Sequence, residues 1–238
     1  MFKKFAINIL TCLSILSCSN VSDNLNNSRS TFINNTNNYK LIASLPEENI
    51  QLYGQSPKSK EESNYQDLML MVDGKTKKLE WTNVISATFA PQLISADMNK
   101  DGVKELVIIL TTGTGSDFHI EEVHVLNPSN FYEIKVVNPL NIVRENVIRN
   151  ITKNNNNVLI SITVKGHKTE IIKDIQYTPV WFDNVGFGQE IHWRVSDNKL
   201  YADLDAQVSP AGFVGTVTIE YTFKNDIFDL KDIKFKAI

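Results

Sequence analysis

The sequence has little cysteine, no excess of positive charge and no apolar run long enough to cross a bilayer. Its 238 residues contain two cysteines, Cys12 and Cys18, which is too few for a disulfide-rich scaffold. The formal net charge is -3, so the chain has no general attraction for nucleic acid, and we expect no nucleic-acid partner. The apolar stretch from Phe5 to Leu16 is too short for a transmembrane helix.

Fingerprints of familiar catalytic sites are also missing from the sequence. The segment from Thr111 to Ser116 has two glycines but neither a third glycine nor a following helix, so it does not predict a phosphate-binding loop. Ser116, Asp117 and His119 lie too close together in an extended chain to converge as a triad, and no G-x-S-x-G surrounds the serine. The sequence therefore favours a non-catalytic role.

The amino terminus has the pattern of an export signal. Lys3 and Lys4 precede the apolar stretch, which ends in the residues Ile15-Leu16-Ser17-Cys18. These last four residues resemble the lipobox of bacterial lipoproteins, in which cleavage before the cysteine leaves a diacylated amino terminus. The resemblance implies a signal peptide at 1–17, lipidation of Cys18, and a protein held on the cell membrane outside the cytoplasm. The alternative is an ordinary signal peptide or an uncleaved anchor.

The rest of the chain predicts a flexible tether followed by a mainly β structure. Residues 18–39 are rich in Asn and Ser and poor in apolar side chains, so burial cannot compensate for the entropy lost on ordering. Segments in which apolar and polar residues alternate follow, and dipeptides that favour a left-handed backbone mark turns between them. These turn dipeptides are Asp73-Gly74, Asp197-Asn198 and Asn225-Asp226. The segment from Ile85 to Ile94, which contains Pro91, predicts a short edge strand.

One packing helix is predicted near the middle of the chain. Asn138 suits the cap position and Pro139 the first helical position. Apolar residues then recur four apart, and they are Val143, Val147 and Ile151. This spacing predicts about three helical turns, ending in the polar run 154–157. The predicted fold class is mainly β (α+β), with antiparallel sheets and hairpins, in two subdomains at 40–137 and 138–238.

The stretch from Asp97 to Glu105 has a spacing that indicates a specific chemistry. It reads Asp97-Met98-Asn99-Lys100-Asp101-Gly102-Val103-Lys104-Glu105, with oxygen side chains at positions 1, 3, 5 and 9 and glycine at position 6. Ca²⁺ takes six to eight oxygen ligands, and alternate residues of a loop can supply them. Position 12 is Ile108, within an apolar run that predicts a buried strand, so the loop is not an EF-hand. The alternative to an ion site is a solvated acidic turn.

This stretch resembles the calcium loop of FG-GAP and VCBS-type repeats. The resemblance implies side-chain ligands from Asp97, Asn99, Asp101 and Glu105 and a carbonyl ligand from Val103. Lys100 stands where those repeats often have glycine, which costs about 1 kcal/mol if the residue must be left-handed. Because the loop occurs once, a propeller is excluded. Residues 81–238, with Glu122, His124 and Asn127 after the loop, also resemble predicted Gram-positive lipoproteins of unassigned activity.

A polar patch is predicted on one side of the hairpin around Asp197-Asn198. A two-residue turn there places Ile191, Trp193 and Val195 opposite Leu204, Ala202 and Leu200 on an apolar side. The other side then pairs His192 with Asp203 and Glu190 with Asp205. This side is either a functional patch or a solvated outer face.

Two functions remain open at this level. The first is a lipid-anchored surface protein whose calcium loop stabilises a domain that binds an extracellular or envelope partner. The second is an envelope hydrolase with an unrecognised acid and histidine set around His192 and Asp203.

Overall fold

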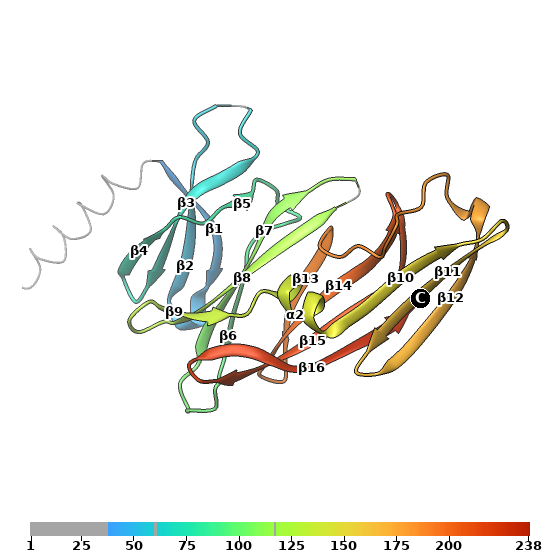
Figure 1. The fold of residues 1–238 in the computed structure, drawn as a ribbon. Coiled ribbons are helices and arrows are strands. Elements are labelled where there is room, and N and C mark those ends of the chain that lie inside the picture. The colour runs from blue at the N-terminus through green and yellow to red at the C-terminus, as the bar shows by residue number, and fades with distance from the viewer. Residues whose placement is uncertain (1–37, 60, 117) are drawn as a thin grey trace, which may run out of the picture. The chain divides into compact units, whose positions relative to one another are not determined.

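Strands dominate the computed structural model, which describes residues 38–59, 61–116 and 118–238 (Figure 1). Tyr39–Ile238 form one compact unit. The predicted signal peptide 1–17, the lipidation site Cys18 and nearly all of the predicted tether lie outside the described residues. The fold class is confirmed, because the unit is mainly β with antiparallel sheets and one α-helix among its described residues.

The first sheet is a set of antiparallel strands near the start of the unit. Its order is β1-β2-β3-β4, and β5 pairs with β3. The bounds are β1 Tyr39–Leu45, β2 Ile50–Gln55, β3 Asn64–Val72, β4 Lys75–Leu79 and β5 Asn83–Val84, with the 3-10 turn η1 at Pro46–Glu48. Asp73 and Gly74 join β3 to β4 with φ angles of 49° and 79°, which confirms the predicted turn.

The second sheet has eight strands in the order β13-β14-β15-β16-β9-β8-β7-β6, and β13 also pairs with β8. The bounds are β6 Gln92–Ala96, β7 Glu105–Thr114, β8 His119–Asn127, β9 Tyr132–Val136, β13 Glu190–Ser196, β14 Lys199–Ser209, β15 Gly212–Lys224 and β16 Ile227–Ala237. Two short contacts, β16 with β9 and β13 with β8, are parallel, and the other pairings are antiparallel. The predicted edge strand is β6, which begins later than expected. Strands from both sides of residue 137 therefore pair in one sheet.

The third sheet corrects the predicted helix. The helix α2 spans Pro139–Asn146 and is capped as predicted, since Asn138 Oδ1 accepts a hydrogen bond from Leu140 N at 2.8 Å. Val147 and Ile151, however, belong to strand β10, so the prediction of three helical turns was wrong. The sheet order is β10-β11-β12, with bounds β10 Val147–Lys153, β11 Asn157–Val164 and β12 His167–Asp174, followed by the 3-10 turn η2 at Ile175–Tyr177. A spacing of four residues places side chains on one face of a helix and also on one face of a strand.

Strand β7 is buried on both faces and belongs to two cores. Leu106, Ile108 and Leu110 pack with the first sheet, whereas Val107 and Ile109 pack with the rest of the unit. All five side chains are at most 2% exposed, which confirms the predicted buried strand. Each such burial contributes about 1.5 to 3 kcal/mol, so β7 is a rigid base for the loop that precedes it.

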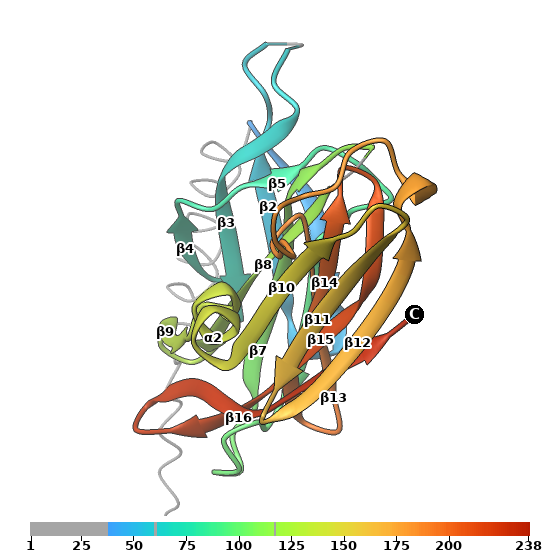
Figure 2. The same ribbon diagram turned by 45° about the vertical axis from the view of Figure 1, so that its right-hand side comes forward.

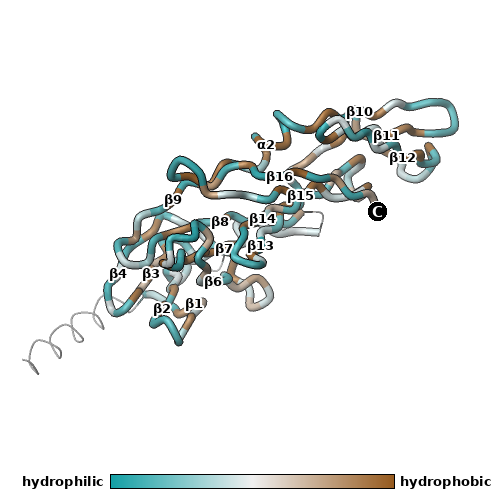
Figure 3. The backbone as a smooth tube through the Cα atoms, turned by 90° about the horizontal axis from the view of Figure 1, so that it is seen from below, coloured by the Kyte–Doolittle hydropathy of each residue, from teal (hydrophilic) through white to brown (hydrophobic). Residues whose placement is uncertain are grey.

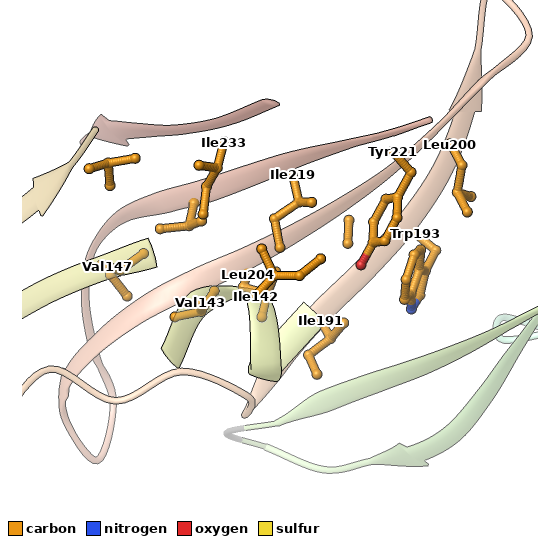
Figure 4. Close-up of a cluster of buried hydrophobic side chains, with 14 of the residues drawn as sticks. Ile142, Val143, Val147, Ile191, Trp193, Leu200, Leu204, Ile219, Tyr221 and Ile233 are labelled. Atoms are coloured by element: carbon orange, nitrogen blue, oxygen red, sulfur yellow. The ribbon is translucent and has the colours of Figure 1, made fainter. Parts of the chain in front are cut away.

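The larger core joins the eight-stranded sheet to the three-stranded sheet and to α2. The strand β11 contacts β16 (Figure 2). Buried residues alternate with more exposed ones along β11 and along much of β15, and hydrophobic and hydrophilic residues are interspersed along the backbone in Figure 3. Ile142 and Val143 of α2 gather with Trp193 and Tyr221 in one cluster (Figure 4). Burial raises the pKa of Tyr221, whose hydroxyl donates to Val137 O at 2.9 Å.

Within 38–59, 61–116 and 118–238, no helix has the length and apolar character needed to cross a membrane.

Candidate functional site

The predicted calcium loop is the connection between β6 and β7. Ala96 and Glu105 pair across the two antiparallel strands, so residues 97–104 close a hairpin between them. Glu105 is the first residue of β7, and it is only 3% exposed. The loop thus has one carboxylate at its buried base and the rest of its oxygen side chains in a short turn above it.

Glu105 holds the start of the loop through its carboxylate. Its Oε2 accepts hydrogen bonds from Met98 N at 2.8 Å and from Asn99 N at 3.3 Å. Burial raises the pKa of Glu105 and the nearby charge of Asp101 adds to the rise, while the backbone N–H groups act in the opposite direction. The carboxylate therefore satisfies two backbone donors at the expense of its own solvation.

The remaining oxygen side chains organise the turn from within. Asn99 Oδ1 accepts from Asp101 N at 2.9 Å, and Asp101 Oδ1 accepts from Val103 N at 2.7 Å, as in Asx turns. Lys100 has a φ of 65°, so the left-handed backbone considered from the sequence is present. Gly102 has a φ of 87° at the sharp turn, where glycine carries no steric penalty.

One loop oxygen is buried without a partner among the described residues. Asp97 Oδ2 accepts from Gly102 N at 3.2 Å, but Asp97 Oδ1 is shielded from solvent and has no hydrogen bond to any residue that the structure describes. Lys104 does not neutralise it, because its Nζ extends to Glu48 Oε1 at 3.0 Å. In the part of the chain that the structure describes, the carboxylates of Asp97, Asp101 and Glu105 do not converge within 4.8 Å of one another. A bound cation would have to draw them closer.

The predicted polar patch lies on the hairpin of β13 and β14, whose register is the predicted one. Ile191, Trp193 and Val195 pair with Leu204, Ala202 and Leu200, and His192 pairs with Asp203. The antiparallel pairing stops at Ile191. Glu190 pairs with His119 of β8 instead of lying in the ladder with Asp205.

The acidic members of the patch are satisfied by neighbours on β13 and β15. Asp203 accepts from Arg194 Nε at 2.8 Å and from Thr218 Oγ1 at 2.6 Å. Asp205 accepts from Thr216 Oγ1, also at 2.6 Å. His192 Nε2 lies 3.3 Å from Glu190 Oε2, and Asp203 is instead paired with Arg194. The contacts therefore do not join His192 and Asp203 as an acid and histidine pair.

Sequence reasoning missed the residues that do approach His192. His119 and Glu121 on β8 lie beside it, where β8 and β13 run parallel. The pairing joins residues about 70 positions apart, and parallel pairing carries no local turn signal. In the sequence His119 stands near Ser116, which is exposed, and near Asp117, which is outside the described residues, so its neighbours in the chain give no indication of His192.

His124 and Glu122, further along β8, have different surroundings. His124 stacks on Trp81, with ring centroids 3.5 Å apart, and its Nδ1 lies 2.7 Å from Glu133 Oε1. Its Nε2 is buried without a partner among the described residues. Glu122 is exposed. These contacts make His124 part of the packing between β8, β9 and the segment after β4.

Comparisons with models of protein families, with curated proteins and with solved structures find no match for this chain. The residues and contacts described above are therefore the basis for the function proposed below.

Proposed function

We propose that this protein is a lipid-anchored surface protein outside the cytoplasm, whose β unit binds Ca²⁺ and serves a binding or structural role. The export pattern and the lipobox-like residues before Cys18 support the location. The loop from Asp97 to Glu105 supports the ion. The observation that carries the proposal is the buried Oδ1 of Asp97, which has no hydrogen-bond partner among the described residues. It belongs to a loop whose potential metal ligands are all oxygen atoms.

The donor set of the loop fits Ca²⁺ by its chemistry. Hard cations take oxygen ligands, and the loop offers carboxylates of Asp97, Asp101 and Glu105, the amide of Asn99 and the carbonyl of Val103. Bound Ca²⁺ would neutralise charges that otherwise repel one another. The chain contributes the preformed turn, because its Asx turns and left-handed residues already hold the backbone in place.

Thermal unfolding of the full-length protein in detergent tests the ion. Extracellular calcium modules have a Kd of about 0.1 to 1 mM, so about 10 mM Ca²⁺ would add about 1.4 to 2.7 kcal/mol. For a unit of this size, the Tm would rise by roughly 3 to 11 °C relative to the chelated protein.

Asp101→Asn is the sharpest variant for this experiment. Asparagine keeps an oxygen that can accept from Val103 N, but it removes one charge, so the calcium shift should fall to less than about half. Asp226→Asn is the matched control, since it makes the same change at an exposed turn residue with a φ of 61°. An unchanged Tm in wild type, or an equal shift in Asp101→Asn, would remove calcium from the proposal.

Membrane fractionation tests the anchor. Wild-type protein should partition with membranes and carry an acyl modification at Cys18 that mass spectrometry detects. Cys18→Ser should abolish both results, since the thiol is the acylated group. Soluble wild-type protein without acylation would contradict the anchor and leave the calcium proposal intact.

The binding role is supported by apolar side chains on the outer face of the third sheet. Ile148 on β10 is 74% exposed and Ile172 on β12 is 68% exposed, and Leu159 on β11 pairs directly with Ile172. Crosslinking on intact cells should capture a partner with wild type and lose it with Ile148→Lys and Ile172→Lys together. Equal capture by the double variant would exclude this face as the contact surface.

A further inference from the structure

Two histidines and a glutamate meet where β8 and β13 run side by side. Glu190 pairs with His119 and Ile191 with Ile120, and His119 N donates to Gln189 O at 2.8 Å. One potential ligand atom each of His119, Glu121 and His192 lies within 4.8 Å of the other two. The two imidazole rings are stacked, with centroids 4.8 Å apart and an interplanar angle of 17°.

We propose that His119, Glu121 and His192 form a binding site for a divalent transition metal ion of the Zn²⁺ type. Imidazole nitrogen is a ligand that zinc and its neighbours prefer and that Ca²⁺ does not, so this site is chemically distinct from the oxygen-only loop. Two histidines with one carboxylate form a ligand set common in zinc sites that keep a position open.

Glu121 is held in place before any metal binds. It is 9% exposed, and its Oε2 accepts from Trp193 N at 2.6 Å. The indole Nε1 of Trp193 also donates to the backbone oxygen of Glu121 at 3.2 Å. One carboxylate oxygen is thus used to fix the side chain, and Oε1 remains on the side of His119, 3.2 Å from its Nε2.

His119 is positioned by packing and by this same carboxylate. Its ring contacts the half-buried ring of Phe89, with centroids 5.1 Å apart. In zinc sites with metal–nitrogen bonds of about 2.0 to 2.1 Å, tetrahedral ligand atoms lie about 3.3 Å apart. The separation between His119 Nε2 and Glu121 Oε1 already has this value, so these two ligands are preorganised.

His192 is the ligand that must move to complete the site, and its exposed side leaves the ring room to rotate. Its side chain is 48% exposed, and it reaches Glu190 Oε2 at 3.3 Å. A rotation of this exposed ring can shorten its distance to the other two ligands without disturbing the core. Because the site opens toward solvent on this side, the ion has an entry path and one coordination position is left for water. Glu190 is placed to orient the ring, as carboxylates do for metal-bound histidines.

The alternative explanation is a structural ion pair, in which Glu121 serves only to hold Trp193 and His119. That explanation requires no affinity for a metal. Titration of the chelator-treated full-length protein with Zn²⁺ separates the two, with isothermal titration calorimetry to measure stoichiometry and affinity. We expect one Zn²⁺ per chain at this site, and Co²⁺ in its place should give the visible absorption of a tetrahedral ion.

Two variants test the ligands, and neither should prevent folding. His192→Gln changes an exposed side chain, and Glu121→Gln keeps an oxygen that can accept from Trp193 N. Substitution of a residue that only orients a metal ligand weakens metal binding by about 10- to 100-fold. Loss of a direct ligand should therefore weaken Zn²⁺ binding by at least about tenfold. The Tm of the metal-free His192→Gln protein should equal that of metal-free wild type.

The control is His167→Gln, which removes an exposed histidine at the start of β12 and should leave Zn²⁺ affinity unchanged. Asp101→Asn should also retain Zn²⁺ binding, and His192→Gln should retain the calcium shift, so failure of one site is distinguishable from failure of the other. Absence of Zn²⁺ binding in wild type, or equal affinity in wild type, His192→Gln and Glu121→Gln, would overturn the proposed site.

Discussion

Substitution of Glu105 by alanine or by glutamine separates two properties of its side chain, the hydrogen bonds that it accepts and the charge that it carries. Its Oε2 is the acceptor for Met98 N and Asn99 N at the buried base of the loop. Alanine removes both the acceptor and the charge, whereas glutamine keeps an acceptor oxygen of similar reach. The comparison is made in chelator, so that no metal contributes.

The structure sets the expected magnitudes. A buried donor left unsatisfied costs about 1 to 3 kcal/mol. Glu105→Ala removes the acceptor of Asn99 N and leaves Met98 N with only its 3.1 Å hydrogen bond to Ala96 O, so we expect a loss of about 2 kcal/mol. For a unit of this size, that loss lowers the Tm by roughly 4 to 8 °C. Glu105→Gln should stay within about 1 kcal/mol of wild type, because it keeps the hydrogen bonds and avoids burying a charge.

The pH dependence gives an independent measure of the buried charge. The pKa of Glu105 in the folded protein is raised above its ordinary value of 4.5, mainly by burial. The folded state therefore binds more protons than the unfolded state between these two pKa values, and stability falls as the pH rises through that window. Glu105→Gln should lack this fall. Ca²⁺ should oppose it, since a cation favours the ionised carboxylate.

Urea unfolding in chelator, repeated from about pH 4 to about pH 7, measures both effects through the free energy of unfolding. If glutamine destabilises the protein as much as alanine does, the acceptor oxygen is not the source of the stability. A loss below about 0.5 kcal/mol for alanine, the size of an ordinary surface substitution, would likewise contradict the structural role of Glu105.

Three further predictions concern the rest of the unit. Asn83→Ala should lower the free energy of unfolding, measured in urea, by about 2 to 4 kcal/mol. The buried amide of Asn83 donates two hydrogen bonds and accepts one from Thr111 N, and this last bond joins β5 to β7. A loss below about 1 kcal/mol would contradict this role. Ile108→Ala should lower the free energy of unfolding by about 2 to 5 kcal/mol, because it removes buried apolar area and leaves a cavity. Ile172→Ala on the exposed face should lower it by less than about 0.5 kcal/mol. Equal losses for the two variants would contradict the difference in burial. Hydrogen bonding to Lys165 lowers the pKa of Asp232 from 3.8 to about 2, so the ionised Asp232 stabilises the protein above pH 3.8 and this stabilisation is lost as the pH falls toward 2. In acid unfolding followed by circular dichroism, Asp232→Asn should reduce the loss of stability between these two pH values. An unchanged loss of stability would contradict the role of Asp232.

Much of the β structure follows from local sequence rules. Asp73-Gly74, Asp197-Asn198 and Asn225-Asp226 all have positive φ angles in the turns where they were expected. The predicted register of β13 with β14 is confirmed from Ile191 onward, because a two-residue turn fixes which residues face one another, whereas the predicted pair of Glu190 and Asp205 is absent. The continuous apolar run of β7 predicted its burial, and the cap at Asn138 predicted the start of α2.

The helix shows where a local rule is ambiguous. Val143, Val147 and Ile151 share a face in either a helix or a strand, since four is close to the helical repeat and is twice the strand repeat. From Val147 onward the chain is a strand, because β10 pairs with β11 along its whole length, from Val147 with Val164 to Lys153 with Val158. Valine and isoleucine also prefer extended backbone.

The class of fold, the hairpin turns, the buried strand and the spacing of oxygen side chains between β6 and β7 can be predicted from the sequence, because each depends on residues that are close in the chain. The position of β8 beside β13, which brings His119 and Glu121 to His192, is seen only in the folded unit. The same is true of the hydrogen bonds from Arg194 and Thr218 to Asp203. Pairing between distant strands depends on how the whole sheet buries its apolar faces, and no local pattern specifies it.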